Sequence, residues 1–412
     1  MRAGGCTFLL FLAAGPLLAQ DPPLDRLLAG PERTDLRWTV SIPPAALSNF
    51  QRLWVRIAIR VDGKEIEKRN GTGAFLFAAE FRDSADKPYR TQIRVDLNDY
   101  QKATAQHELE CVLQAFVLPG VYNLSLAAIE PSTEKLSLTH RTLRVAPLNN
   151  DPLPDAWRDF PAVDFIDIPE LPDGWFLPNE RGRLFLQVEN HRPARIEILA
   201  NVSPTETSRR QGRAYNRNMD AILPAIKILS RIGVRDGSKN VAVIDVARRR
   251  VSYEQSGRRE LDWPALKQAL DADNPNKIDA GSLKERDQDA QFFVSEATRR
   301  AVAAPGEQRI LIVLSGPVTF TTHQEIQPIE GSPGPHARVY YLRFKPSPLN
   351  GFAGSLSAPV RRGPGGVPFP APPVVANDEL ERTLKPLQPR LFDIYSPVDF
   401  RKALAAILKE IE

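Results

Sequence analysis

Asn201, Ser203 and Thr205 stand at alternate positions directly after a short strand-like run, Arg195–Ala200. Their side chains offer one amide and two hydroxyls. In open α/β sheets, ligands bind in the crevice outside the carboxyl ends of the strands. We therefore expect these three residues to face a binding crevice. An acidic side chain of a partner could approach the hydroxyls and the neighbouring backbone amides there without a cation.

A simpler interpretation of the same residues is structural. Asn and Ser side chains readily hydrogen-bond to nearby backbone N–H groups, and so stabilise turns and the beginnings of helices. On this interpretation Asn201 and Ser203 cap the turn after the strand and the helix that follows. Both interpretations stay open at the level of the sequence.

Two further stretches complete a pattern with this motif. The apolar run Ile310–Leu314 ends in Ser315-Gly316-Pro317, and the chain closes with a strand, Leu391–Tyr395, followed by Ser396-Pro397-Val398-Asp399-Phe400. The runs Arg195–Ala200 and Ile310–Leu314 resemble the first and fourth strands of a von Willebrand factor type A domain. The closing stretch resembles the terminal strand and helix of that family, so the resemblance covers residues 183–412. The chain is also similar to the exported, type A-related proteins of bacteria.

The resemblance implies a metal-ion-dependent adhesion site, but the sequence departs from it. The family's first motif is Asp-x-Ser-x-Ser, and Asn201 replaces the Asp while Ser203 and Thr205 keep the hydroxyls. Gly316 stands where a second Asp is expected. Mg²⁺ prefers about six oxygen ligands, including carboxylates that neutralise its charge. We therefore expect a degenerate site with no metal and no other cofactor.

The family's remaining ligand, a Thr, corresponds most closely to Ser282 in the stretch Asp279-Ala280-Gly281-Ser282. The binding positions implied by the resemblance are thus Asn201, Ser203, Thr205, Ser282 and Gly316. If a cation such as Mg²⁺ binds at all, we expect its ligands to be Asn201, Ser203, Thr205 and Asp279.

The beginning of the chain predicts export. Arg2 precedes an apolar run, Phe8–Ala14, and a small-residue stretch that ends at Ala19, as in a secretory signal peptide. No other segment is long and apolar enough to cross a membrane. We expect a periplasmic, cell-surface or extracellular protein. After leader removal Cys111 is the only cysteine left, and its apolar, alternating surroundings predict a buried structural thiol.

Composition and pattern predict two domains after the leader. The chain has 412 residues and 37 prolines, which favours strands, turns and rigid connections over long helices. We expect a leader at 1–19, a spacer at 20–35, an all-β sandwich at 36–147, a packed proline-rich connector at 148–182 and an α/β domain at 183–412. A Pro/Gly-rich insertion interrupts the last at about 346–377.

The sandwich is predicted from short alternating strands. Trp54–Val61 alternates and meets Asp62-Gly63, a strong signal for a hairpin turn. Pro119-Gly120-Val121-Tyr122 begins a stretch that resembles the penultimate hairpin of bacterial immunoglobulin-like modules. The fold class we expect is therefore an immunoglobulin-like β-sandwich, followed by a doubly wound, mostly parallel, Rossmann-type sheet.

Strands and helices alternate in the second half. We expect helices over 216–232, 263–270 and 290–302, and strands over 240–246, 250–254, 309–314 and 338–344. The pattern Ser396, Pro397, Asp399 predicts an N-cap, a first helical residue and a capping box for the last helix.

Several function classes are not supported by the sequence. The net charge of +4 and the scattered arginine pairs, without interleaved aromatic residues, do not indicate nucleic-acid binding. Nucleophile-elbow, phosphate-loop and zinc-protease motifs are missing, and the five histidines lack metal-ligand spacing. We therefore expect no catalytic residues and no enzyme.

The function we predict is non-enzymatic binding of a protein partner, whose identity the sequence does not give. One alternative is cation-dependent adhesion, with a remodelled site completed by Asp279 or by a carboxylate of the partner. Another is a hydrolase with an unrecognised set of catalytic residues.

Overall fold

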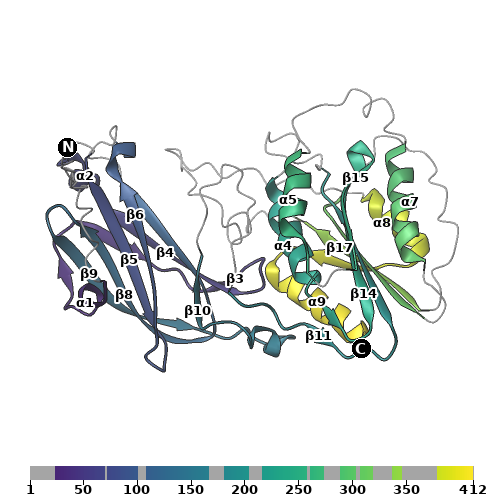
Figure 1. The fold of residues 1–412 in the computed structure, drawn as a ribbon, viewed down its shortest axis with the longest axis horizontal. Coiled ribbons are helices and arrows are strands. Elements are labelled where there is room, and N and C mark those ends of the chain that lie inside the picture. The colour runs from purple at the N-terminus through teal and green to yellow at the C-terminus, as the bar shows by residue number, and fades with distance from the viewer. Residues whose placement is uncertain are drawn as a thin grey trace, which may run out of the picture. The chain divides into compact units, whose positions relative to one another are not determined.

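The computed structural model describes residues 24–69, 72–100, 108–166, 181–203, 216–257, 260–272, 288–302, 307–318, 336–345 and 378–411. Within them the protein is mostly β-sheet, in several sheets, with some helices (Figure 1). It divides into two compact units, one formed by residues 1–41, 58–113 and 121–143 and the other by 42–57, 114–120 and 144–412.

The helices are α1 (Leu24–Leu28), α2 (Gly63–Glu67), α4 (Asn216–Leu229), α5 (Trp263–Ala272), α7 (Asp289–Ala301), α8 (Glu379–Leu384) and α9 (Pro397–Ile411), with 3-10 turns η1 (Leu97–Tyr100), η2 (Pro154–Trp157), η3 (Val246–Arg248) and η5 (Lys385–Leu387).

The strands are β1 (Arg33–Thr34), β2 (Trp38–Ser41), β3 (Ala46–Leu47), β4 (Leu53–Val61), β5 (Ala74–Arg82), β6 (Pro88–Asp96), β7 (Leu109–Val117), β8 (Gly120–Glu130), β9 (Lys135–Val145), β10 (Val163–Phe165), β11 (Gln187–Val188), β12 (Ala194–Asn201), β13 (Gly233–Val234), β14 (Gly237–Asp245), β15 (Arg250–Ser256), β16 (Gln308–Ser315), β17 (Ala337–Phe344) and β18 (Arg390–Ile394).

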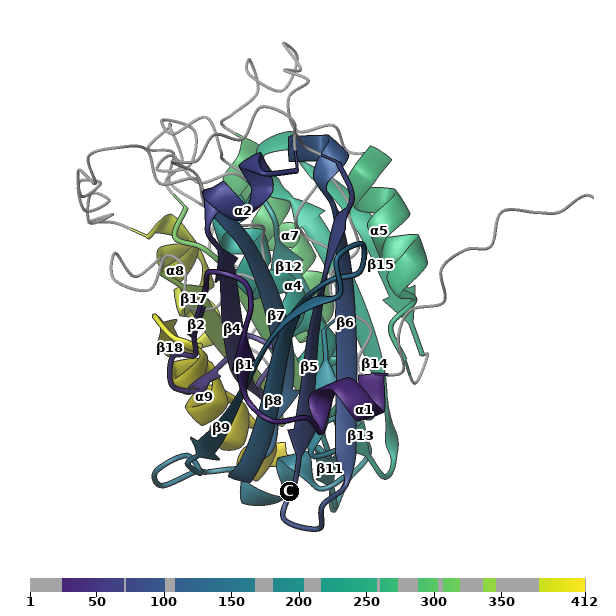
Figure 2. The same cartoon turned by 90° about the vertical axis from the view of Figure 1, so that its left-hand side faces the viewer.

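The strands before residue 166 form two sheets. One has the order β1-β9-β8-β5-β6, and the other has the order β10-β7-β4-β2 with β3 paired to β4. Strand β5 pairs antiparallel with both β6 and β8, and Figure 2 shows these long strands side by side. This part of the chain is therefore mostly β-strand, as expected, with two short helices, α1 and α2.

Strand β5 is buried on both faces because a helix covers one of them. Leu28 of α1 packs with Leu76 and Ala78 of β5, while Phe75 and Phe77 point to the opposite face; all five side chains are at most 1% exposed. The expected polar spacer thus contributes an apolar helix to this core.

The prediction of a hairpin at Asp62-Gly63 is wrong. Asp62 instead caps α2, accepting a hydrogen bond at 2.8 Å from Lys64 N, and the helix buries Ile66. Asp and Gly favour helix beginnings as well as turns, so the dipeptide alone does not distinguish the two.

The second unit contains a six-stranded sheet with the order β15-β14-β12-β16-β17-β18. The pairs β14–β12, β12–β16, β16–β17 and β17–β18 are parallel, whereas β15 runs antiparallel to β14 at one edge. The sheet is therefore mixed, and the doubly wound arrangement expected from the sequence stays a proposal.

Helices pack against both faces of this sheet (Figure 1). Leu199, Leu311 and Tyr341 point toward α7 and α8, in a core that also holds Phe293 at 0% exposure. The alternate residues point toward α9: the Tyr340 hydroxyl donates to Glu410 Oε2 at 2.5 Å, and Phe344 lies beside Phe400. The near-continuous apolar character of β12 and β16 follows from this two-sided burial.

The helices predicted after residue 215 are confirmed as α4, α5, α7 and α9, with boundaries shifted by a few residues. Ser396 and Asp399 cap α9 as expected: Asp399 N donates to Ser396 Oγ at 3.3 Å, and Ser396 Oγ donates to Asp399 Oδ2 at 2.9 Å. Among the described residues, no helix is both long and apolar enough to span a membrane.

Cys111 of β7 is buried, as the sequence predicts, and burial raises the pKa of its thiol to about 12. Because thiolate is the reactive form, we expect the folded protein that lacks residues 1–19 to resist Ellman's reagent at pH 8 and to react fully in guanidinium chloride. Complete labelling of the folded protein within minutes would contradict this assignment.

Candidate functional site

Four polar side chains meet at the carboxyl ends of the three central strands. Asn201 ends β12, Ser203 follows it, Asp245 ends β14 and Ser315 ends β16. The parallel register aligns these ends, since Asn201 pairs with Ile244 and Ala200 with Leu314. All four side chains are buried, with exposures of 2%, 6%, 2% and 0%. We call these four residues the carboxyl-edge cluster.

Both ends of the Asn201 amide are engaged. Its Oδ1 accepts hydrogen bonds from Ser203 N at 3.1 Å and from Ser203 Oγ at 2.7 Å. Its Nδ2 donates to Ser315 Oγ at 3.0 Å, and Ser315 Oγ donates to Gly316 O at 2.7 Å. An Asp at position 201 could not donate to Ser315, so the amide links β12 to β16 in a way that a carboxylate would not.

Ser203 connects this amide to the next strand. Its Oγ lies 3.1 Å from Asp245 Oδ1 and accepts a hydrogen bond from Ala247 N at 3.1 Å. Asp245 also accepts from Arg248 N at 3.2 Å, which caps η3, and the Arg248 guanidinium lies 3.5 Å from its second oxygen. The cluster therefore continues from β16 through β12 to the turn after β14.

Asp245 and Ser315 were not predicted as site residues from the sequence. Asp245 was included in a buried strand, although an acid that ends the apolar run Val241–Ile244 is itself a signal of a strand end. Of the expected positions, Asn201 and Ser203 meet directly and Gly316 joins them through Ser315. Thr205, Asp279 and Ser282 lie outside the described residues.

The described part of this edge fits a hard divalent cation poorly. It supplies one carboxylate, one amide oxygen and two hydroxyls, and each of these groups is hydrogen-bonded within the cluster. The described residues contain no group of three or more His, Cys, Asp or Glu side chains that could hold a metal ion. With a single negative charge, such a donor set offsets little of the cost of dehydrating Mg²⁺.

A second polar group lies on the same edge, beyond β16. Asp378, the N-cap of α8, accepts from the Tyr341 hydroxyl at 2.9 Å, from Arg343 at 3.3 Å and from Val318 N at 3.2 Å. Burial raises the pKa of Asp378 despite these hydrogen bonds. Since Val318 closely follows Gly316, this group continues the polar edge toward β17.

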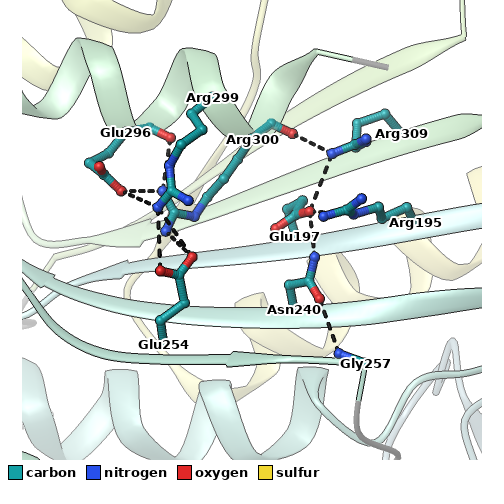
Figure 3. Close-up of polar contacts among 9 residues, drawn as sticks. All are labelled: Arg195, Glu197, Asn240, Glu254, Gly257, Glu296, Arg299, Arg300 and Arg309. Carbon is teal, nitrogen blue, oxygen red and sulfur yellow. Dashed lines mark hydrogen bonds and ion pairs between the residues drawn. The ribbon is translucent and has the colours of Figure 1, made fainter. Parts of the chain in front are cut away.

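The opposite end of the same sheet face carries a buried charged network (Figure 3). Glu197 Oε1 accepts from Arg195 Nε and Asn240 Nδ2, both at 2.7 Å, and from Arg309 NH1 at 3.3 Å. Asn240 Oδ1 accepts from Gly257 N at 3.2 Å. One carboxylate thus joins β12, β14 and β16, with hydrogen bonds that extend to the end of β15.

The network continues onto α7. Arg300 donates to Glu254 of β15 at 2.8 Å and to Glu296, while its backbone oxygen accepts from Arg309 at 3.4 Å. Arg299 contacts the same two carboxylates, at 3.1 and 3.0 Å (Figure 3). Each cation here has an acidic neighbour, so the arrangement fixes α7 on the sheet rather than offering a charge to a ligand.

Comparison with known proteins does not assign the chain to a family. No protein-family model matches the chain, and no curated protein matches it. Among solved structures it is similar to a family 76 glycoside hydrolase from a bovine Bacteroides thetaiotaomicron strain, at 10% sequence identity and a TM-score of 0.18. That match covers 30% of this chain and spans only 24% of the other.

This match contradicts the expectation that the protein is not an enzyme, and we do not maintain that expectation. A TM-score of 0.18 carries no argument for glycoside hydrolysis either. The match therefore assigns neither a reaction nor a catalytic residue to the chain.

The buried network makes a stability prediction. Replacing Glu197 by Ala leaves Arg309, whose side chain is 7% exposed, without its buried carboxylate. Removing one partner of a buried ion pair costs about 3–5 kcal/mol. We expect a loss of that size in urea unfolding of the second unit, and a smaller loss for Glu197→Gln, which can still accept hydrogen bonds.

Glu307→Ala is a matched control, because that carboxylate also contacts Arg309, at 3.0 Å, but is 24% exposed. We expect this substitution to cost less than about 1 kcal/mol. Equal losses for Glu197→Ala and Glu307→Ala would contradict the central role of Glu197.

Proposed function

We propose that this is an exported protein-binding protein, and that its second unit is a type A-like domain that contacts a partner protein at the carboxyl edge of the sheet without a bridging cation. The leader-like residues 1–19 support export.

The path of the chain through the sheet supports a type A-like, doubly wound domain. From β12 the chain moves outward to β14 and β15, and then returns to the other side for β16, β17 and β18. The strand order therefore reverses between β12 and β16. In open α/β sheets with helices on both faces, that reversal is where ligands bind.

The observation that carries the proposal is the hydrogen bond from Asn201 to Ser315 across this reversal, at 3.0 Å. It fills the switch point with the protein's own side chains, and Asn201 Oδ1 is occupied by Ser203. Because these polar groups already bind one another, they support binding by the surrounding surface rather than by a cation held between strands.

Exposed apolar side chains on the same edge support a protein partner. Tyr395 follows β18 and is 49% exposed, and Val398, in the first turn of α9, is 43% exposed. The ammonium of Lys345 lies 5.6 Å from the centre of the Tyr395 ring. Aromatic residues are enriched where proteins meet, because they present a large apolar surface with a polar tip.

The position of Asp245 favours a second candidate function, cation-dependent adhesion. Its carboxylate lies 3.1 Å from Ser203 Oγ, so Asn201, Ser203 and Asp245 bring three oxygens close together with one negative charge. A partner carboxylate could complete such a site.

Thermal unfolding of the protein without its leader separates the two candidates. We expect the same Tm in 5 mM Mg²⁺, Mn²⁺ or Ca²⁺ as in EDTA, because a ligand raises Tm only when it binds the folded state. A rise that disappears in Asp245→Asn but persists in Asp399→Asn, an acid on the same edge outside the cluster, would favour cation-dependent adhesion.

Capture experiments test the binding surface itself. We expect the immobilised protein to capture the same exported proteins from the source cells in Mg²⁺ and in EDTA, and the Tyr395→Ala/Val398→Ala variant to lose them. Val302→Ala is the control, since Val302 is 60% exposed and is the C-cap residue of α7. Equal capture by both variants would contradict the proposed surface.

A further inference from the structure

Arg401 of α9 is a buried cation held by the chain that precedes the second unit's sheet. Its guanidinium donates to both oxygens of Asp151, at 2.6 and 2.8 Å, and to Leu153 O at 2.7 Å. The same group lies over the Trp157 ring, 4.5 Å from its centroid. The Arg401 side chain is 2% exposed and that of Asp151 is 11% exposed.

A third segment closes these contacts into a ring. Trp157 Nε1 donates to Gln51 O at 2.6 Å, and Gln51 Nε2 donates to Pro397 O at 2.9 Å, in the first turn of α9. Gln51 is 0% exposed and has a φ of 58°, in the left-handed region. Its strained backbone is therefore held by the same contacts.

A second buried ion pair extends the ring along the connector. Arg52 NH1 donates to Asp164 Oδ2 at 2.7 Å, and the two side chains are 2% and 3% exposed. The Arg52 guanidinium lies over the Phe160 and Phe116 rings, at 4.0 and 4.5 Å from their centroids. Two arginines thus hold residues 151–165, which are the described part of the expected connector.

We propose that Arg401, Asp151, Trp157 and Gln51 form a conformational latch that holds residues 151–165 against α9, and that the latch opens and closes as a unit. All of its residues belong to one compact unit. Breaking any one contact leaves a buried charge or donor without its partner, so partial opening is disfavoured.

Mild acid does not open the latch. Burial pushes the pKa of Asp151 upward, but the hydrogen bonds from Arg401 and from Leu153 N outweigh it, and the pKa lies below its ordinary value of 3.8. The stabilisation by this carboxylate is therefore fully present above pH 3.8 and is lost only as the pH falls through the lower, folded-state pKa.

The first turn of α9 links the latch to the carboxyl edge. Pro397, which accepts from Gln51, lies between Tyr395 and Val398, the exposed residues of the proposed partner surface. This link, which rests on the proposed function, implies that partner binding and latch closure influence each other reciprocally.

Hydrogen exchange of the leaderless protein tests the latch without any partner. We expect Asp151→Asn and Arg401→Lys to speed exchange of backbone amides in residues 151–165 at least tenfold, while amides of β12 and β16 keep their protection. Trp157→Phe keeps an aromatic ring beneath Arg401 but removes the donor to Gln51 and part of the ring, so we expect a smaller change with the same distribution.

Arg69→Lys is the matched control, because Arg69 and Glu130 form a buried ion pair in the other unit. We expect this variant to leave residues 151–165 unchanged. Exchange in Asp151→Asn and Arg401→Lys that rises less than threefold, or that rises equally in β12 and β16, would overturn the latch. Failure of the partner capture alone would leave this result standing.

Discussion

The structure of the second unit depends on one constraint: Glu197 and Asn201, on the α7 face of β12, are buried and must be hydrogen-bonded inside the protein. Along β12 the residues on that face are Arg195, Glu197, Leu199 and Asn201. Leu199 packs in the apolar core with Phe293, while the polar residues on either side of it form the networks described above. The face is therefore banded, with an apolar layer between two polar layers.

This banding fixes the register of the sheet. Glu197 takes hydrogen bonds from β14 and β16, and Asn201 bonds to the last residue of β16. Sliding β16 by one residue would turn Arg309 and Ser315 to the other face and leave Glu197 and Asn201 without these partners. Apolar residues of similar volume could give equal stability, so we infer that the polar residues contribute specificity of pairing.

Much of the local structure could be predicted from the sequence. Apolar runs and cap residues predicted α4, α5, α7 and α9 and the strands from β14 to β18, although not β13 or α8. The position of Asn201 and Ser203 at a strand end followed from the motif. These features depend on neighbours in the chain. The Asp62-Gly63 turn was wrong because the same residue types also begin helices, and the choice depends on whether Ile66 finds a core.

The remaining features depend on residues far apart in the chain. Asp245 joins the carboxyl-edge cluster through Ser203, 42 residues away, and Asp151 meets Arg401 across 250 residues. Neither pair leaves a periodic pattern, because each is a single contact set by the packing of whole elements. A buried arginine such as Arg401 reads in the sequence as an ordinary exposed charge on a helix.

The cover that α1 gives to β5 has a consequence for where the chain can be cut. Leu28 shields an apolar strip made of Leu76, Ala78, Ala127, Ile129 and Leu138. A chain that started after Gly30 would keep its strands but present this strip to water. Because exposed apolar strips on sheets promote self-association, a chain that lacks α1 would associate with itself through this strip.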